Sequence, residues 1–435
     1  MIAGPLRIST FQADATPPIG SALCNGLVPP AKEIVTPLTA RGLVLLGAGE
    51  PIVLCAIDSV GIANEGHDAF RQALAQAVGT SMDRVTVHTL HQHDAPGSDF
   101  GTERLLADQG LGGLYSNADF DRAVIARLAN AAHAALTTAQ LVTRVGLGAG
   151  LVEKVASNRN IIGPDGKVVM QRNSSSRNPK AQVAPEGTID PQVRIISFWN
   201  GDRPLAVLSY YATHPQSYYG YGSVNWDFVG MARELRENAL PGVAHIHFDG
   251  AGGNVAAGKY NDGSPEMRPI LAERLAAGMK RAWDSQRKMA VTADDVRWSI
   301  EPVAIPVRDT LKENELLAKL VDPKEPQAQR IRAARDLTFV RRTEAGHRIP
   351  ISCLQLGPAR VLHLPGELFV EYQLAAQQMR PDDFVAMAAY GDCGPGYIGT
   401  ATAYRRGGYE TGIVSRVAPQ VEQVLTNAMR KLLKP

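Results

Sequence analysis

Residues 42–57 read Gly42-Leu-Val-Leu-Leu-Gly-Ala-Gly-Glu-Pro-Ile-Val-Leu-Cys-Ala-Ile57, two apolar runs around a turn-forming segment. Apolar runs of this length, bounded by Gly and Pro, predict buried strands at 42–46 and 51–57. A helical pattern follows at 65–78 and ends at a glycine, as helices commonly do. The Val- and Thr-rich segment 84–90 predicts another strand. Strand, helix and strand in succession indicate an α/β layered fold.

The alternation of strands and helices continues along the chain. We predict further strands at 193–199, 205–212, 243–248, 360–364 and 384–390, and further helices at 119–139, 227–238, 265–285 and 414–434. Residues 309–343 are charged and helical, and we interpret them as a helical surface excursion. The sequence shows no internal repeat and no linker, so we expect a single domain over residues 1–435.

The composition is that of an ordinary folded protein. The 435 residues are 45% hydrophobic and 20% charged, with a net charge of +2. This balance gives no reason to expect nucleic acid or an anionic membrane as a partner. No apolar run is long enough for a transmembrane helix, and the N-terminus lacks the pattern of a signal peptide. We therefore expect a protein that is cytoplasmic or that was secreted and lost its leader; the oligomeric state is not indicated.

The four cysteines give no sign of a metal or redox site. Cys24, Cys55, Cys353 and Cys393 include no C-x-x-C pair, which argues against a thiolate zinc site and a dithiol redox site. Four cysteines in a chain of this length do not form a disulfide framework, and we expect them to be reduced.

A cluster of histidines lies at the end of the predicted strand at 84–90. It reads His88-Thr-Leu-His91-Gln-His93-Asp-Ala-Pro96-Gly97. Residues two apart on a strand face the same side, so His91 and His93 are expected to point together into a cleft at the strand's carboxyl end. Two imidazoles there suit a divalent metal, or one ligand and one proton shuttle. The alternative is a pair of hydrogen-bonded surface histidines.

Two more potential ligands follow predicted strands. His214 ends the strand at 205–212, and Glu367 follows Leu364-Pro-Gly after the strand at 360–364. Each side chain has the chemistry of a metal ligand. Taken alone, each also fits an ordinary role, as a structural histidine or an exposed loop glutamate.

Two Gly-rich segments complete the set of motifs. Residues 393–412 contain Tyr397 and Tyr409 among several glycines, which suits a pocket wall or a Tyr-rich surface loop. Residues 248–263 form a Gly-rich loop after a strand. This loop does not match a P-loop, because Lys259 is followed by tyrosine and not by Ser or Thr.

The order of these motifs, over nearly the whole chain, resembles the catalytic domain of the neutral/alkaline non-lysosomal ceramidase family. The segment from His91 to Pro96 stands in place of the family's H-T-H-S-G-P motif. The remaining matches are Asn158-Arg159 for an N-R element, His214 for a later histidine motif, Glu367 for a P-G-E motif, and Tyr397 and Tyr409 for the tyrosines of Y-V-T-T…Y-E-G.

The resemblance implies a layered mixed β-sheet domain with flanking helices and one bound zinc ion. The zinc ligands it implies are His91, His214, Glu367 and Tyr397. It further implies His93 as the catalytic acid/base, Tyr409 as an oxyanion partner, and Arg159 and Asn254 as substrate-binding residues. Zinc held by two neutral imidazoles and one carboxylate keeps a positive charge and an open position, and so can activate water.

The chain departs from the family pattern in two places. Ala256 stands where the family has a serine, so a serine nucleophile is not available there. The chain ends at Pro435 without the immunoglobulin-like domain that ceramidases add. We predict a zinc-dependent hydrolase that cleaves an amide bond of a small or amphiphilic N-acyl compound. The alternatives are an esterase, lactonase or carbohydrate-active enzyme on the same scaffold, a TIM-barrel amidohydrolase, or a non-catalytic binding protein that retained the fold.

Overall fold

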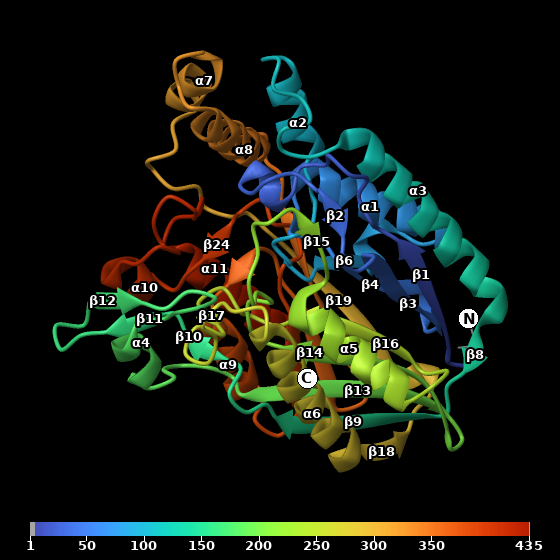
Figure 1. Ribbon diagram of the computed structural model, residues 1–435. Coiled ribbons are helices and arrows are strands. Elements are labelled where there is room, and N and C mark those ends of the chain that lie inside the picture. The colour runs from blue at the N-terminus through green and yellow to red at the C-terminus, as the bar shows by residue number, and fades with distance from the viewer. Residues whose placement is uncertain (1–4, 435) are drawn as a thin grey trace.

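The computed structural model describes residues 5–434 and contains three main mixed sheets (Figure 1). The first has the order β6 (Val85–Thr89), β4 (Gly49–Ile57), β3 (Thr39–Gly47), β1 (Arg7–Asp14), β8 (Gln140–Leu141). The second has the order β16 (Ala244–Asp249), β14 (Arg203–Tyr211), β13 (Gln192–Asn200), β9 (Arg144–Leu151), β18 (Arg287–Ala290). The third has the order β19 (Val296–Val303), β20 (Ile349–Leu356), β21 (Ala359–His363), β23 (Phe384–Ala388).

One topology recurs in each sheet: an antiparallel hairpin, a helix, and a strand parallel to the second hairpin strand. The three units are β3-β4-α1-β6, β13-β14-α5-β16 and β20-β21-α9-β23, where α1 is Asn64–Val78, α5 is Asp227–Ala239 and α9 is Val370–Met379. The sequence shows no internal repeat, because this repeat lies in the connections between elements and not in a recurring motif. Each unit ends with two parallel strands whose carboxyl ends lie at the same edge.

The three sheets enclose one central core. In β4, Ile52, Leu54 and Ala56 face this core, whereas Val53 and its alternate neighbours face the helices outside. Residues from β13, β14, β20 and β21 fill the same core from the other two sheets. Since side chains alternate along a strand and both faces are covered, these strands are largely apolar, which is why the sequence predicts β4, β13, β14 and β21. Strand β20, which has Pro350, Ser352 and Gln355 among its apolar residues, was not predicted.

Pairs of helices cover the outer face of each sheet. The first sheet packs on α1 and α3 (Ala118–Ala135), the second on α5 and α6 (Met267–Ser285), and the third on α9 and α11 (Val421–Leu432). Figure 1 shows α3 and α6 along two different sides of the molecule. The predicted class, a layered mixed-sheet α/β fold with flanking helices, is confirmed.

The segment predicted as a surface excursion is helical but is not confined to the surface. It forms α7 (Glu313–Val321) and α8 (Gln327–Glu344), which lie with α2 (Phe100–Ala107) at one end of the molecule (Figure 1). Ile331 and Leu337 of α8 are buried in a small cluster with Leu106 and Tyr115. The high average charge of the segment conceals this apolar stripe from sequence analysis. Helix α8 also forms one wall of the cavity described below.

Several elements differ from the sequence prediction: β1, β18, β19, β20, α2 and α9 were not predicted, and the last helix and strand β9 differ for reasons that the local structure shows. The last helix begins at Val421 and not at 414, because Pro419 precedes it and Ser415 bridges to Gly396. Strand β9 was not predicted because alternate positions are glycine. A Cβ at Gly148 would lie 2.0 Å from the Ala282 carbonyl oxygen, so these glycines let α6 pack directly on the strand.

Short elements connect the sheets near the carboxyl ends of their strands. They form the two-stranded pairs β2 (Glu33–Ile34) with β15 (Ser223–Val224), β5 (Gly61–Ile62) with β7 (Gly97–Ser98), β10 (Ser157–Asn158) with β17 (Val255–Ala256), β11 (Asn160–Ile162) with β12 (Val168–Gln171), and β22 (Glu367–Leu368) with β24 (Tyr397–Ile398), and the helices α4 (Pro179–Val183) and α10 (Ala401–Arg406). Within residues 5–434 the four cysteines are free, as expected, and no helix is long and apolar enough to cross a membrane.

Candidate metal centre

Each main sheet contributes one residue to a compact group of potential ligands. His91 follows β6 in the first sheet, His214 follows β14 in the second, and Glu367 follows β21 in the third. The edge strands of the sheets meet here, since β16 contacts both β6 and β23. The ligand atoms of the three side chains lie within 4.8 Å of one another.

His91 and His93 lie side by side, but not through strand alternation as predicted. Strand β6 ends at Thr89, and the backbone of His91 is left-handed, with φ of 53°. A non-glycine residue in this conformation is uncommon and is maintained by its surroundings. The two rings are 5.1 Å apart between centroids and nearly perpendicular. A loop therefore brings the two imidazoles together.

Hydrogen bonds fix the same tautomer in both histidines of the group. Nδ1 of His91 donates to the Val60 carbonyl oxygen at 2.5 Å, and Nδ1 of His214 donates to the Gly252 carbonyl oxygen at 2.7 Å. Each Nε2 is then left with a lone pair, as in histidine ligands of metals. Both Nε2 atoms lie 3.2 Å from Oε2 of Glu367.

The three converging atoms are all acceptors, which fits a bound cation. Nε2 of His91 is buried and has no hydrogen-bond partner among the described residues. Burial lowers the pKa of His214, so its imidazole is neutral. Burial raises the pKa of Glu367, but its contacts with His91 and His214 outweigh burial and hold that pKa well below its usual range, so Glu367 is a carboxylate. Two imidazoles and one carboxylate are one of the ligand sets found in catalytic zinc sites.

Tyr397, the fourth predicted ligand, joins the same group. Its hydroxyl oxygen lies 3.1 Å from Nε2 of His214 and accepts a hydrogen bond from Nη1 of Arg159 at 3.0 Å. Burial and the charge of Glu367 raise the pKa of Tyr397, which keeps the phenol protonated unless a cation binds its oxygen. The structure thus brings together all four side chains that the resemblance implies as ligands, and their binding of a metal stays a prediction.

His93 lies beside this group with one ring nitrogen free. The side-chain amide nitrogen of Gln216 donates to Nε2 of His93, and the amide oxygen of Gln216 accepts from Ser174. This arrangement places the His93 proton on Nδ1, which is buried and has no partner among the described residues. Burial, followed by the neighbouring His91 and His214, holds the pKa of His93 well below its usual range. The ring is therefore neutral, with an N–H available for donation.

A cavity of about 90 Å³ opens beside the candidate ligands. His91, His93, Glu367 and Tyr397 line it on one side. Tyr409 lines it too; its side chain is partly exposed, and its ring lies 5.9 Å from that of Tyr397. The ring of Tyr409 thus lies beside that of Tyr397 in the cavity wall, and its role as an oxyanion partner stays a prediction.

The two predicted substrate-binding residues are used inside the protein. Arg159 lies 3.2 Å through Nε from Glu410 and donates to Tyr397, and it is not part of the cavity wall. Asn254 donates to Glu371 at 2.9 Å and accepts from the backbone nitrogen of Val370 at 2.9 Å, so it holds the start of α9. These contacts indicate positioning roles, and the predicted contact with a substrate stays a prediction.

Sequence reasoning did not identify several residues around the centre. The ring of Tyr390 packs on His91 at 4.9 Å, Gln216 fixes the tautomer of His93, and Glu410 neutralises Arg159. Arg332 and Arg335 of α8 line the cavity. Glu410 directly follows a predicted site residue and could have been noticed. The other residues belong to no motif, and only the folded chain shows where they lie.

The Gly-rich loop at 248–263 serves close packing. A Cβ at Gly252 would lie 2.8 Å from the backbone of Thr213, and one at Gly253 would lie 2.2 Å from the carbonyl oxygen of Glu367. The loop thus packs against the backbone segments that carry His214 and Glu367 and holds them close together. Ala256, at the family's serine position, is fully buried in β17 and lines no part of the cavity.

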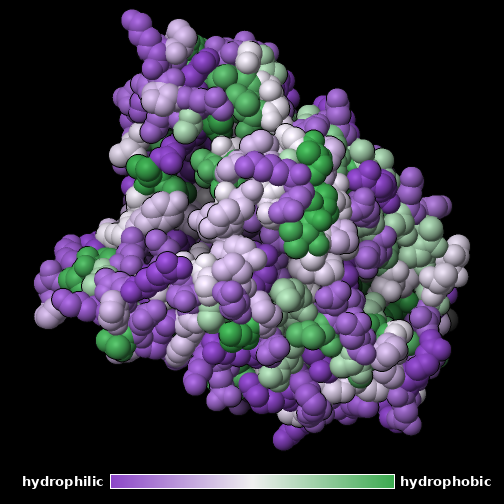
Figure 2. Space-filling model, in the orientation of Figure 1, coloured by the Kyte–Doolittle hydropathy of each residue, from purple (hydrophilic) through white to green (hydrophobic). Residues whose placement is uncertain are grey.

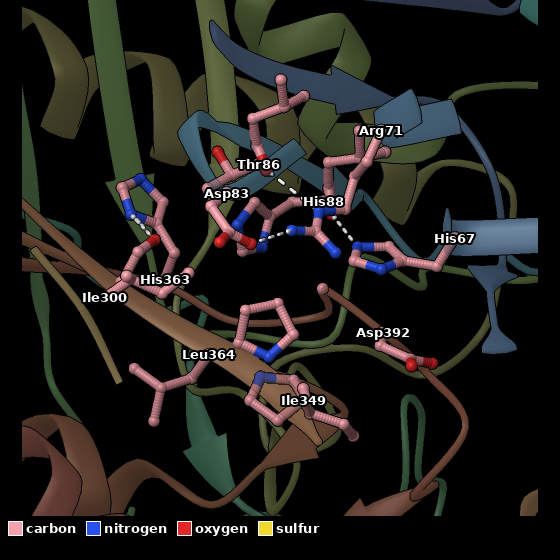
Figure 3. A pocket seen from close by; sticks show the side chains of 16 residues that line it. His67, Arg71, Asp83, Thr86, His88, Ile300, Ile349, His363, Leu364 and Asp392 are labelled. Carbon is pink, nitrogen blue, oxygen red and sulfur yellow. Dashed lines mark hydrogen bonds and ion pairs between the residues drawn. The ribbon is translucent and has the colours of Figure 1, made fainter. Parts of the chain in front are cut away.

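His88, the first histidine of the cluster, faces a different cavity (Figure 3). This cavity is lined by His67, His88, His363 and Asp392, among others, and its volume is about 20 Å³. Burial lowers the pKa of His88 to about 3, and it holds the pKa of His363 well below its usual range. The space has room for about one water molecule. These neutral imidazoles are therefore core residues, and the space cannot admit a substrate.

Comparison with solved structures identifies the fold. The neutral ceramidase from Pseudomonas aeruginosa matches with a TM-score of 0.69 and 16% sequence identity, over 98% of this chain and 74% of that chain. A ceramidase structure described as complexed with C2 matches with a TM-score of 0.71 and 17% identity, with the same coverage. No model of a known protein family and no curated protein matches the sequence. At these identities the likeness shows a shared fold, and the fold implied by the resemblance is confirmed.

Proposed function

We propose that this chain is a zinc-dependent hydrolase that cleaves the amide bond of an N-acyl compound. The observation that carries the proposal is the convergence of two unprotonated imidazole nitrogens on one carboxylate oxygen, at 3.2 Å each. Acceptor atoms without protons between them repel one another unless a cation joins them. The fold supports the same reaction, because its solved neighbours are ceramidases.

The proposed ligands are His91, His214, Glu367 and Tyr397. A zinc ion bound there would lower the pKa of a water molecule to about 7 and polarise the acyl carbonyl. The hydrogen bonds from both Nδ1 atoms to backbone carbonyls hold the rings with Nε2 turned to the centre. Arg159 holds the Tyr397 oxygen through the 3.0 Å hydrogen bond.

The remaining roles belong to two side chains at the cavity. In amide hydrolysis the oxygen of water bonds to the acyl carbon, the carbon–nitrogen bond breaks, and the nitrogen takes up a proton. We assign to Tyr409, which lines the cavity, the donation of its phenolic hydrogen to the carbonyl oxygen as negative charge develops there. The attacking water releases one proton in this reaction. We assign His93, whose buried Nδ1 has no partner among the described residues, to carry it: the neutral ring takes up the proton of the water and becomes neutral again when the leaving nitrogen accepts it.

Hydrolysis of a medium-chain N-acyl amide by the purified chain tests this function. We expect turnover that EDTA abolishes and zinc restores. Replacement of Tyr409 by Phe should lower kcat by roughly 100-fold or more, and His93→Gln by about 100-fold or more. Tyr221→Phe is the matched control, because Tyr221 is 65% exposed and lies outside the cavity wall. Turnover unchanged by EDTA, or equal rates for the two Phe variants, would contradict the proposal.

A further inference from the structure

One face of α8 forms the cavity wall opposite the candidate ligands. Ala328, Ile331, Arg332 and Arg335 of this helix line the cavity. Their spacing of three and four residues places them on a single helical face. The surface is hollowed between the α7–α8 region and the segments around α10 and β24 (Figure 2). This face therefore looks toward whatever compound enters the site.

The guanidinium groups of Arg332 and Arg335 have no protein partner. Within residues 5–434 no hydrogen bond or ion pair joins either group to another residue. The nitrogen atoms of neither guanidinium are both fully buried and unpaired. The side chain of Arg335 lies over the ring of Tyr115, with Cζ 5.6 Å from the ring centroid. Both side chains are half-buried, so water solvates them only in part.

No free carboxylate in the cavity wall offsets these two charges. The wall contains a third arginine, Arg416, whose Nε lies 2.6 Å from Asp336, so that carboxylate is already paired. Asp336 itself does not line the cavity, and the acid among the lining residues is Glu367, which belongs to the proposed metal group. Two arginines three residues apart also repel each other along the helix. Folding alone gives no reason to place them together here.

The charges of both arginines reach the reacting groups. Burial and the charge of Glu367 raise the pKa of Tyr409, and the charges of Arg159 and Arg332 act in the opposite direction. Burial lowers the pKa of Arg335, but nearby groups that include Tyr115, Asp336 and Glu367 raise it overall. Arg332 therefore lies within electrostatic range of Tyr409, and Arg335 within electrostatic range of Glu367.

We propose that the compound bound in this cavity carries an anionic group, a carboxylate or a phosphate, which Arg332 and Arg335 bind. The inference rests on the proposed function, because it names the class of N-acyl compound that the same site takes. Arginine is suited to this role, since its fork of N–H donors matches both groups. Leu27 and Ile413 line the same cavity and are 54% and 68% exposed, which provides an apolar surface for an acyl chain. An N-acyl amino acid has this combination.

Calorimetric titration of the EDTA-treated chain tests the inference without catalysis and without binding of the anion to a metal. The probes are N-octanoylglycine, N-octanoyl-O-phosphoethanolamine and the neutral N-octanoylglycinamide. We expect one anionic probe or both to bind with a Kd roughly tenfold or more below that of the neutral probe. The tighter anion identifies the group.

The variants separate charge from shape. Arg332→Gln and Arg335→Gln should remove the preference for anionic probes, and Arg335→Lys should retain part of it. Arg341→Gln is the matched control, because Arg341 lies on the same helix and pairs with Glu313 outside the cavity wall. Thermal denaturation shows which variants are folded. Equal binding of the anionic and neutral probes by the wild type would overturn the inference.

Hydrolysis of the same probes by the zinc-loaded chain distinguishes the two proposals. If the neutral N-octanoylglycinamide is hydrolysed with the same kcat/KM as the anionic probes, the proposed hydrolase function stands and the inference of an anion site is overturned. Anion-selective binding that depends on both arginines, without hydrolysis of any probe, would support the inference and contradict the hydrolase. A higher kcat/KM for an anionic probe, lost in Arg335→Gln and kept in Arg341→Gln, supports both.

Discussion

Arg159 donates a hydrogen bond to the hydroxyl of Tyr397 at 3.0 Å, while its Nε lies 3.2 Å from a carboxylate oxygen of Glu410. The side chains of Arg159 and Glu410 are only 7% and 1% exposed. Tyr397 in turn lies against His214 of the candidate metal centre. A buried ion pair therefore positions one proposed ligand. Each charge of the pair is shielded from water and is balanced by the other.

Removal of one member of this ion pair should destabilise the protein strongly. We expect Arg159→Met to lower the free energy of unfolding by about 3–5 kcal/mol, because Glu410 is left buried and charged. The double variant Arg159→Met/Glu410→Gln should lose less than the sum of the two single variants, since no charge is stranded. Urea unfolding at neutral pH measures all four proteins, and strictly additive losses would show that the two side chains do not interact.

A methyl group at Gly253 should weaken metal binding from outside the set of ligands. A Cβ there would lie 2.2 Å from the carbonyl oxygen of Glu367, so the segment that carries this ligand must shift. We expect Gly253→Ala to raise the Kd for zinc by about 10–100-fold, as for changes in the residues that support metal ligands. Gly112→Ala is the control, because a Cβ there meets its nearest atom at 3.4 Å. Equal zinc affinity of the two variants would refute this account of the Gly-rich loop.

The metal-free chain should become less stable as the pH is lowered, and His88 should account for part of this loss. Burial lowers the pKa of His88 to about 3, against about 6.5 in an unfolded chain. Between these values only the unfolded state binds the proton, so stability is lost as the pH falls below about 6.5, by about 1.4 kcal/mol per pH unit.

A variant isolates this contribution. His88→Gln should reduce the slope of unfolding free energy against pH by about that amount between about pH 6 and 4.5. His133→Gln, at an exposed position of α3, should leave the slope unchanged. The measurement is denaturant unfolding of EDTA-treated protein at several pH values. An identical slope for wild type and His88→Gln would mean that His88 is protonated in the folded state.

Much of the fold could be predicted from sequence because its strands are buried on both faces. The hairpin at 39–57 and the helix at 64–78 carry continuous apolar runs and a glycine at the helix end, which need no tertiary information. Strand β9 was missed because its glycines serve contact with α6, a relationship between segments far apart in the chain. The repeat of three units was missed because it lies in the topology alone.

The candidate site was predictable where a residue type and a strand end coincide. His91, His214 and Glu367 each follow a strand, and the order of motifs identified Tyr397 and Tyr409. The partners of these residues were not predictable. Gln216 and Arg335 reach the centre from loops and helices whose packing the sequence does not show.

Zinc content tests the central claim most directly. Wild type, Glu367→Gln and Glu371→Gln are loaded with zinc, passed through gel filtration and analysed for metal per chain. Glu371 is the control, because it lies four residues beyond Glu367 and accepts a hydrogen bond from Asn254 away from the ligand group. The account predicts about one zinc ion per chain in wild type and Glu371→Gln and almost none in Glu367→Gln. Wild type without zinc, or full retention by Glu367→Gln, would contradict it.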